Sequence, residues 1–170
     1  EALIAAAVDG FGGLDILVNN AGITRDATMR KMTEEQFDQV IAVHLKGTWN
    51  GTRKAAAIMR ERKSGAIVNL SSAQGHACQQ GVAAYVASKG AIHAPTRAMA
   101  LDHAAAGVRV NSVSPGYCET PLVMAMNDDV RAQIVEKVPV GRLGQPRVDQ
   151  RPVQPAAAVV ADRQRHRRSD

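Results

Sequence analysis

The stretch "AIVNLSS" (residues 66–72) follows Gly65 and runs through mainly apolar residues to a pair of serines. A short run of this kind, bounded by turn-forming and polar residues, is typical of a buried strand. Two runs of similar character lie on either side of it along the chain, "LDILV" (14–18) and "VRVNSV" (108–113). We therefore predict three buried strands.

Helical segments are predicted in both intervals between these strands. Residues 33–59 open with Thr33 and Gln36 at the spacing of a capping box, and apolar residues then recur at helical intervals. Residues 84–106 form the second predicted helix, which Gly107 ends. Strands that alternate with helices predict a parallel sheet with crossover helices, which is an α/β fold.

The composition fits one globular unit with an aliphatic core. Of the 170 residues, 45% are hydrophobic but only 3% are aromatic. The two cysteines, Cys78 and Cys118, have no CxxC spacing, which favours a reduced, cytoplasmic compartment. No apolar run approaches the roughly 18 residues of a membrane span, and no secretory signal is visible, so we expect no membrane association.

Residues 147–170 differ in character from residues 1–146, which we take as the folded unit. They contain no Leu, Ile, Met, Phe or Gly, and their six arginines and three aspartates contribute +3 to the formal net charge of +5. Because this stretch has neither a helical nor a strand period, we predict that it is disordered. No aromatic residue interleaves the arginines, so we expect no nucleic-acid binding.

Tyr85 and Lys89 stand four residues apart in "AAYVASKGA" (83–91), within the second predicted helix. Residues i and i+4 share one face of a helix, and an ammonium group close to a phenol favours the phenolate form. Tyr85 is therefore a candidate general acid or base. The alternative is that the two side chains are only neighbours on a solvated helix.

Three polar loops follow the three predicted strands. Ser72 closes the middle strand 13 residues before Tyr85, "NNAG" (19–22) follows the first strand, and "SPGYCET" (114–120) follows the third. Parallel sheets bind ligands at the carboxyl ends of their strands. We therefore predict that the three loops form one pocket.

These motifs together resemble the short-chain dehydrogenase/reductase family. The resemblance covers about residues 1–146 and consists of four motifs in order: Asn19-Asn20-Ala21-Gly22, Ser72, Tyr85-xxx-Lys89, and Pro115-Gly116 with Thr120. It implies a Rossmann-type doubly wound parallel sheet. We expect this sheet to be partial, without the first strands, their Gly-rich phosphate loop and the last strand.

The resemblance implies a role for each of these residues. Tyr85 would donate a proton to a carbonyl oxygen, Ser72 would hydrogen-bond the same oxygen, and Lys89 would hold the ribose of a nicotinamide cofactor. Hydride would pass between NAD or NADP and a carbonyl or alcohol substrate. The cofactor would contact Asn19, Ala21, Gly22, Tyr85, Lys89, Pro115, Gly116, Cys118 and Thr120. No metal is expected, because the histidines lack metal-ligand spacing.

Two segments point to different branches of this family. The segment "NNAGITRDATMRKMTEEQFDQVIAVHLKGTWN" (19–50) is most similar to 3-oxoacyl-thioester reductases of fatty-acid and polyester metabolism. The segment "AQGHACQQGVAAYVASKGA" (73–91) is as similar to members that oxidise sugars or alcohols. Family members form dimers or tetramers through the helices near 48–62 and 84–106, so the resemblance implies a homo-oligomer.

Two positions depart from the family pattern. The fourth catalytic residue, an asparagine that holds a helix kink and a relay water, falls at His44, and histidine can also donate and accept hydrogen bonds. His44 is therefore a catalytic candidate, the alternative being that it only satisfies a backbone carbonyl. Pro95 lies inside the second helix, where proline removes a backbone hydrogen bond, and we expect a kink that costs about 3 kcal/mol.

An alternative to an active oxidoreductase is a non-catalytic fragment, unable to bind cofactor alone, that acts only by associating with another subunit. The resemblance stops abruptly at Arg147, from which we hypothesise a shift of reading frame that resequencing the gene would test. An unpaired apolar edge at residues 14–18 would also favour aggregation. Cofactor binding distinguishes the enzyme from the fragment.

Overall fold

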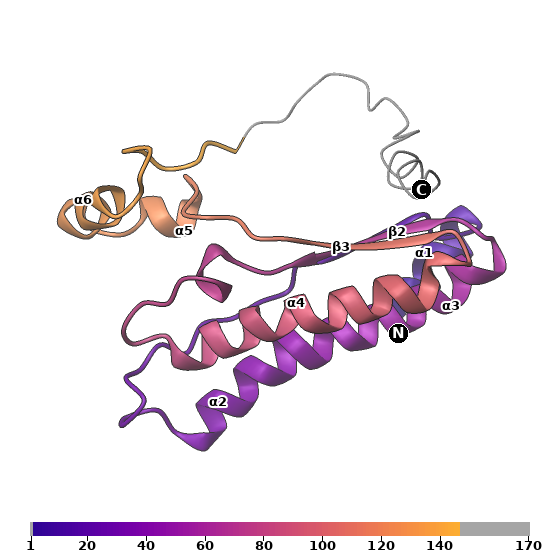
Figure 1. Ribbon diagram of the computed structural model, residues 1–170, viewed down its shortest axis with the longest axis horizontal. Helices are drawn as coiled ribbons and strands as arrows, with labels where there is room; N and C mark the ends of the chain where they lie inside the picture. Colours follow the sequence, from indigo (N-terminus) through magenta and orange to yellow (C-terminus); the bar gives the residue numbers. More distant parts are fainter. Residues whose placement is uncertain (1, 147–170) are drawn as a thin grey trace, which may run out of the picture.

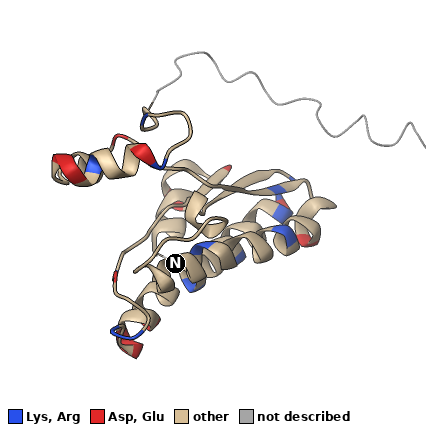
Figure 2. Ribbon diagram, turned by 60° about the vertical axis from the view of Figure 1, so that its left-hand side comes forward, with Lys and Arg blue, Asp and Glu red and all other residues tan. Residues whose placement is uncertain are grey.

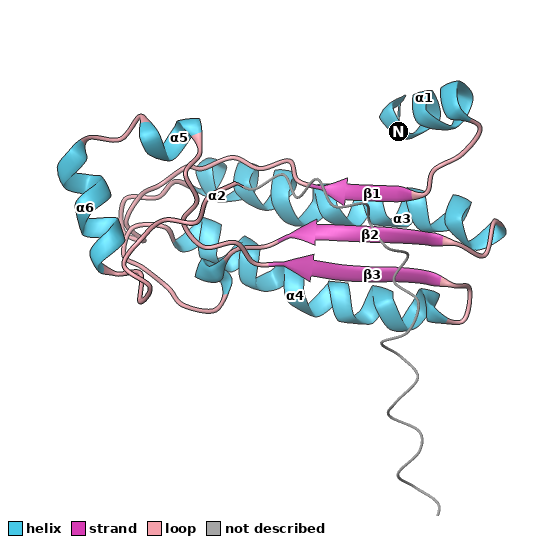
Figure 3. Ribbon diagram, turned by 90° about the horizontal axis from the view of Figure 1, so that it is seen from above, coloured by secondary structure: helices cyan, strands magenta, loops and turns pink. Residues whose placement is uncertain are grey.

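The computed structural model describes residues 2–146, and the tail predicted to be disordered lies outside them. Its centre is a sheet of three parallel strands in the order β1 (Ile16–Asn19), β2 (Gly65–Leu70) and β3 (Val108–Val113). Seen from above, the carboxyl ends of all three strands point the same way (Figure 3). This confirms the predicted α/β fold, a partial Rossmann-type sheet.

Two long helical stretches cover one face of this sheet (Figure 1). The first consists of α2 (Glu34–Ile41), a π-helical turn η1 (Ala42–Lys46) and α3 (Gly47–Glu61), and the second is α4 (Ala83–Ala104). The other helical elements are α1 (Ala2–Phe11), the 3-10 turn η2 (Ala73–Gly75), α5 (Pro121–Met124) and α6 (Asp128–Glu136). Both α5 and α6 lie beyond the carboxyl ends of the strands, and the acidic residues of α6 are visible in red in Figure 2.

The first helical stretch begins where the sequence predicts and contains a π-helical turn. The hydroxyl of Thr33 accepts the N–H of Gln36 at 3.2 Å, and the Gln36 side chain accepts the N–H of Thr33 at 3.0 Å, which confirms the capping box. The stretch is helical throughout, as predicted, but residues 42–46 form a π-helical turn within it. In this turn the N–H of Gly47 reaches the carbonyl of Ala42, five residues back.

The second helical stretch does not end at Pro95. Helix α4 continues through the proline to Ala104 and is drawn as one continuous ribbon in Figure 1. The next residue, Thr96, is buried and donates its hydroxyl to the carbonyl of Ile92 at 2.7 Å, within the turn that the proline interrupts. The helix ends as predicted, because Gly107 follows it at a positive φ of 72°.

The core is aliphatic, as the composition predicts. It lies between the sheet and α3, where six buried residues form one cluster: Ala55, Ala56, Met59, Ile67, Val108 and Val110. Gly65, the first residue of β2, lies very close to α3. A Cβ at this position would lie only 2.4 Å from the sulfur of Met59. The small core residues therefore bring α3 close to β2.

Strand β1 is exposed both on the face turned away from the helices and along the edge that no other described strand pairs. Ile16 and Val18 are 64% and 52% exposed, and β1 pairs with β2 alone among the described residues. This agrees with the exposed apolar edge that the sequence predicts. No helix in residues 2–146 is long and apolar enough to cross a membrane.

Candidate active site

The loops that follow the three strands meet at one edge of the sheet, as predicted. The N–H of Ser71 donates to the carbonyl of Val113 at 2.8 Å, and the N–H of Ala73 donates to the carbonyl of Pro115 at 2.9 Å. The loop after β1 joins them through a parallel bridge between Ala27 and Val82. The site is therefore built from segments that lie far apart in the sequence.

Tyr85 and Lys89 share one face of α4. The nitrogen of Lys89 lies 5.6 Å from the centre of the Tyr85 ring and donates to the carbonyl of Leu70 at 2.7 Å. Lys89 is only 6% exposed, and burial lowers its pKa. The interpretation of the pair as neighbours on a solvated helix is wrong for Lys89, because its side chain points into the protein at the end of β2.

Ser72 lies in the loop between β2 and α4, next to Ser71, whose hydroxyl donates to the carbonyl of Lys89 at 2.7 Å. Its hydroxyl accepts the N–H of Gln74 at 3.1 Å and so caps the turn η2. This turn packs closely on α4, since a Cβ on Gly75 would lie 3.0 Å from the carbonyl carbon of Lys89. Because the bond from Gln74 uses only the acceptor capacity of the Ser72 hydroxyl, the hydroxyl proton has no acceptor among the described residues and can be donated to a ligand.

His44 lies inside the π-helical turn and is 1% exposed. Its Nε2 accepts the N–H of Ile23 at 2.9 Å, and its Nδ1 lies 2.7 Å from the hydroxyl of Ser88. Its ring meets the Tyr85 ring edge to face, with centroids 5.5 Å apart and an interplanar angle of 81°. Burial and the charge of Lys89 lower the pKa of His44 to about 4.

Gly22, a predicted cofactor residue, leaves space for this histidine. A Cβ on Gly22 would lie 2.9 Å from the Nε2 of His44. Such a contact is too close for any side chain at position 22 unless His44 moves. Close packing against His44 therefore explains the glycine of the "NNAG" loop, a contact that the sequence alone does not reveal.

Asn19, also predicted to bind the cofactor, uses its side-chain amide inside the protein. Its Nδ2 donates to the hydroxyl of Thr52 at 3.1 Å and to the Oδ1 of Asn69 at 2.9 Å. Asn69, which is fully buried, donates in turn to the hydroxyl of Thr96 at 3.0 Å. This polar chain joins β1, β2, α3 and α4, and sequence reasoning missed Asn69, whose signal is an asparagine within a buried strand.

The third loop lies at the same edge. The carbonyl of Pro115 accepts the N–H of Ala73 in the loop after β2, whereas Thr120 caps α5 through its hydroxyl, 3.4 Å from the nitrogen of Val123. Cys118 pairs with Gly144 in a parallel bridge. The cofactor contacts predicted for these residues stay a prediction, and the Thr120 hydroxyl caps a helix.

Tyr117 is a further residue of this loop that sequence reasoning missed. Its hydroxyl donates to the Oε1 of Gln79 at 2.7 Å and accepts from the Nε2 of Gln74 at 2.9 Å. It therefore ties the loop after β3 to the loop after β2. The available signal was an aromatic residue directly after the Pro-Gly turn.

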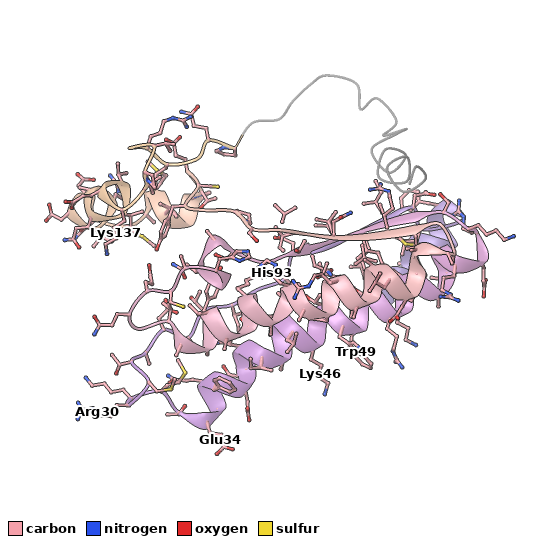
Figure 4. All side chains as sticks on the ribbon, viewed as in Figure 1. Arg30, Glu34, Lys46, Trp49, His93 and Lys137 are labelled. Carbon is pink, nitrogen blue, oxygen red and sulfur yellow. The ribbon has the colours of Figure 1, made fainter. Side chains whose placement is uncertain are left out.

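His93 lies one turn beyond Lys89, between α4 and the sheet (Figure 4). Its Nε2 lies 2.9 Å from the hydroxyl of Ser71, its Nδ1 lies 3.2 Å from the hydroxyl of Ser112, and its ring stacks on His76 with centroids 4.2 Å apart. Burial, followed by the charges of His76 and Arg97, lowers its pKa. His93 thus joins the ends of β2 and β3.

A cavity of about 540 Å³ lies beside β1. Predicted cofactor residues Asn19 and Ala21 line it, whereas Ser72, Tyr85 and Lys89 do not. Its wall also includes residues of β1 and of α1, η1 and α3, among them Leu17, Leu3, Ile4, Val43, Thr48, Asn50 and Lys54. The "NNAG" loop therefore contributes to the wall of this cavity.

Residues 1–131 match the sequence profile of a family described as short chain dehydrogenase. An uncharacterized oxidoreductase of Mycobacterium bovis is 58% identical over 146 residues, which cover 86% of this chain and 59% of that protein. The chain therefore spans about three fifths of the length of this relative.

Two relatives with more specific names show similar coverage. An acetoacetyl-CoA reductase of Allochromatium vinosum is 44% identical over 144 residues, 85% of this chain and 58% of that protein. A 3-oxoacyl-(acyl-carrier-protein) reductase of Staphylococcus aureus is 41% identical over 145 residues, 85% of this chain and 59% of that protein. The chain therefore covers a similar share of each of these two reductases.

Proposed function

Because the chain belongs to the short-chain dehydrogenase family, we propose that it carries the proton-transfer centre of an oxidoreductase that uses NAD or NADP. The observation that carries this proposal is the buried Lys89 ammonium, 5.6 Å from the centre of the Tyr85 ring at the carboxyl edge of the sheet. A buried lysine with a lowered pKa beside a tyrosine is typical of a functional site. Parallel sheets bind ligands at this edge.

The side chains at this edge fit the nicotinamide end of such a cofactor. Lys89 uses one of its three N–H donors on Leu70 among the described residues, which leaves donors for ribose hydroxyl groups. A Cβ on Gly116 would meet no atom within 4 Å, so the backbone there is open to a ligand. When bound, the nicotinamide would supply or accept the hydride.

The protein's own residues would handle the proton. During reduction, the Tyr85 hydroxyl gives its proton to the carbonyl oxygen of the substrate, and the Ser72 hydroxyl donates a hydrogen bond to the same oxygen. The Lys89 ammonium stabilises the phenolate that remains, because opposite charges attract strongly in a partly buried site. In the oxidation direction each of these steps is reversed.

For the substrate, we propose a 3-oxoacyl thioester. The names of two relatives at 44% and 41% identity, an acetoacetyl-CoA reductase and a 3-oxoacyl-(acyl-carrier-protein) reductase, support this class. Both reductions convert a ketone to a secondary alcohol, which is the reaction that a tyrosine proton donor serves. An assay of the chain with acetoacetyl-CoA and either NADH or NADPH tests the proposal and the cofactor choice together.

The Tyr85→Phe variant is the sharpest test of the mechanism. We expect kcat to fall by at least 100-fold, the lower range for lost acid–base catalysis, because phenylalanine keeps the ring but has no proton to give. Ser64→Ala, at the opposite end of the sheet, is the control variant and should have the wild-type kcat. Turnover of Tyr85→Phe at the wild-type rate would remove Tyr85 from the mechanism.

A second candidate function is subunit association without catalysis. It is favoured by a groove on the outer side of α3 and α4, where Trp49 is 45% exposed and stacks against Arg53 at 4.8 Å. Energy transfer from Trp49 to added NADH distinguishes the two candidates, since Trp49 is the sole tryptophan of the chain. Energy transfer to the cofactor that becomes weaker in the Lys89→Met variant supports the enzyme. Absence of binding of both NADH and NADPH supports the association module.

A further inference from the structure

A continuous chain of hydrogen bonds connects the loop after β1 with the turn of α4 that carries Tyr85. It runs from the N–H of Ile23 to His44 at 2.9 Å, from His44 to the hydroxyl of Ser88 at 2.7 Å, and from Ser88 to the carbonyl of Tyr85 at 2.7 Å. His44 is 1% exposed and Ser88 fully buried, so water does not compete for these bonds.

The direction of each bond follows from the number of protons that each group holds. The single hydroxyl proton of Ser88 is donated to the Tyr85 carbonyl, so Ser88 can only accept from His44. The Nδ1 of His44 must therefore carry a proton. The backbone N–H of Ile23 can only donate, so the Nε2 of His44 must be without one. His44 is thus a neutral imidazole with both nitrogens occupied.

The surroundings of His44 make this arrangement rigid. The π-helical turn places the ring inside the protein, and a Cβ on Gly22 would lie 2.9 Å from its Nε2. On the other side, its ring meets Tyr85 edge to face at 5.5 Å. Protonation of Nε2 would place a second positive charge near Lys89 and would break the bond from Ile23.

We propose that His44 and Ser88 are positioning residues that fix the turn of α4 bearing Tyr85, and that His44 does not carry protons in the reaction. This proposal rests on the proposed function for its kinetic consequences but not for its structural ones. It replaces the proton relay that the family resemblance implies at position 44. The loop after β1 and the proton donor are thereby held as one unit.

The structural test needs no activity. In the full chain labelled with nitrogen-15 histidine, NMR should show the His44 Nδ1 protonated and its Nε2 unprotonated from pH 8 to pH 5.5. The missing signals of His44→Asn assign the resonances. A protonated Nε2, or exchange of the ring protons between the two nitrogens in this range, would overturn the proposal even if the protein is inactive.

The coupling to Tyr85 is tested with three variants. We expect Ser88→Ala and His44→Phe each to move the carbonyl-carbon resonance of Tyr85, and the double variant to move it little further, because the hydrogen-bond chain ends on that carbonyl. Thr96→Val, which removes another buried hydroxyl of α4, is the matched control for loss of stability. A Tyr85 carbonyl-carbon resonance that stays unmoved in both single variants would contradict the positioning role.

The kinetic test asks whether His44 acts through Ser88 or independently of it. Asparagine can replace the Nδ1 donor toward Ser88, so His44→Asn should keep kcat within about threefold, whereas Ser88→Ala and His44→Phe should lower kcat about tenfold or more with little change in KM. The pH dependence of kcat should be the same in wild type and His44→Asn. A large loss in His44→Phe with none in Ser88→Ala would show that His44 acts alone and would reject the proposal.

Discussion

The charge state of single residues decides how this protein responds to acid. His44 has a pKa of about 4 in the folded chain, against about 6.5 when unfolded, because it is buried and faces Lys89. The unfolded chain therefore binds more protons between these two values. The stability of the folded chain must then fall as the pH is lowered from about 6.5 to about 4.

We predict that lowering the pH from 7.5 to 5 costs about 2 kcal/mol of unfolding free energy through His44 alone. Urea unfolding followed by Trp49 fluorescence at the two pH values would measure the loss. In His44→Asn, which cannot titrate there, the loss should shrink by about that amount. Equal acid sensitivity in both proteins would mean that His44 is not the group that titrates. Tyr85 and Lys89 are the other titratable side chains that face His44.

The residues that carry the proposed chemistry were largely visible in the sequence, but their environments were not. The spacing of Tyr85 and Lys89 predicted a shared helix face, and the strand ends predicted that Ser72 would lie nearby. The bonds of His44 come from Ile23 and Ser88, which are 21 and 44 positions away in the chain. A pattern of neighbouring residues cannot encode contacts at such separations.

At the scale of elements, α4 is the part of the fold that departs most from sequence rules. It carries the proposed proton donor and keeps its helical path through Pro95, which has no N–H to give to the carbonyl of Ala91. The contacts of Thr96 and Asn69 help to hold the following turn. The expected cost of the proline is thus offset by bonds that only the tertiary structure provides.

We predict that Pro95→Ala stabilises the chain by about 1 kcal/mol or more, because alanine restores the missing backbone hydrogen bond. Urea unfolding would measure the change. Ala94→Ser, at an exposed neighbouring position, should lie within about 0.5 kcal/mol of wild type. A less stable Pro95→Ala would show that the helix has adapted to the proline.

No local sequence rule predicted the π-helical turn at residues 42–46, and only the family resemblance places a helix kink at position 44. The capping box at Thr33 and the stop at Gly107 were predictable, because each depends on residues within one turn. The extra residue of the π turn has no such local signature. It is instead associated with the burial of His44 against Tyr85 and Ser88, which agrees with the frequent occurrence of such turns at functional sites.

At the scale of the whole molecule, the outer surface of the paired helices is the candidate for self-association. The side chains of Lys46 and Trp49 lie on the side away from the sheet (Figure 4), and Pro95 and Met99 line the adjoining groove. A large exposed aromatic residue beside apolar neighbours is typical of interface centres.

We predict that the chain associates with a second copy through this surface, as the family resemblance implies. Sedimentation velocity should show a species larger than the monomer, and Trp49→Glu should shift it to the monomer by placing a charge in the groove. Met124→Glu, an exposed apolar position in α5, is the control that should leave association unchanged. A monomeric wild-type chain would contradict the prediction.

The hydrogen-bonded pair of Asn19 in β1 and the buried Asn69 in β2 also constrains how these strands can slide past each other. A shift of β1 by one residue would place Val18 opposite Asn69 and leave the Asn69 and Thr52 side chains without their partner, at a cost of about 1–3 kcal/mol for each group. Apolar strands alone tolerate such slips far better. The amide of Asn19 therefore selects a single register of β1 against β2. This register also fixes where along β2 the "NNAG" loop begins.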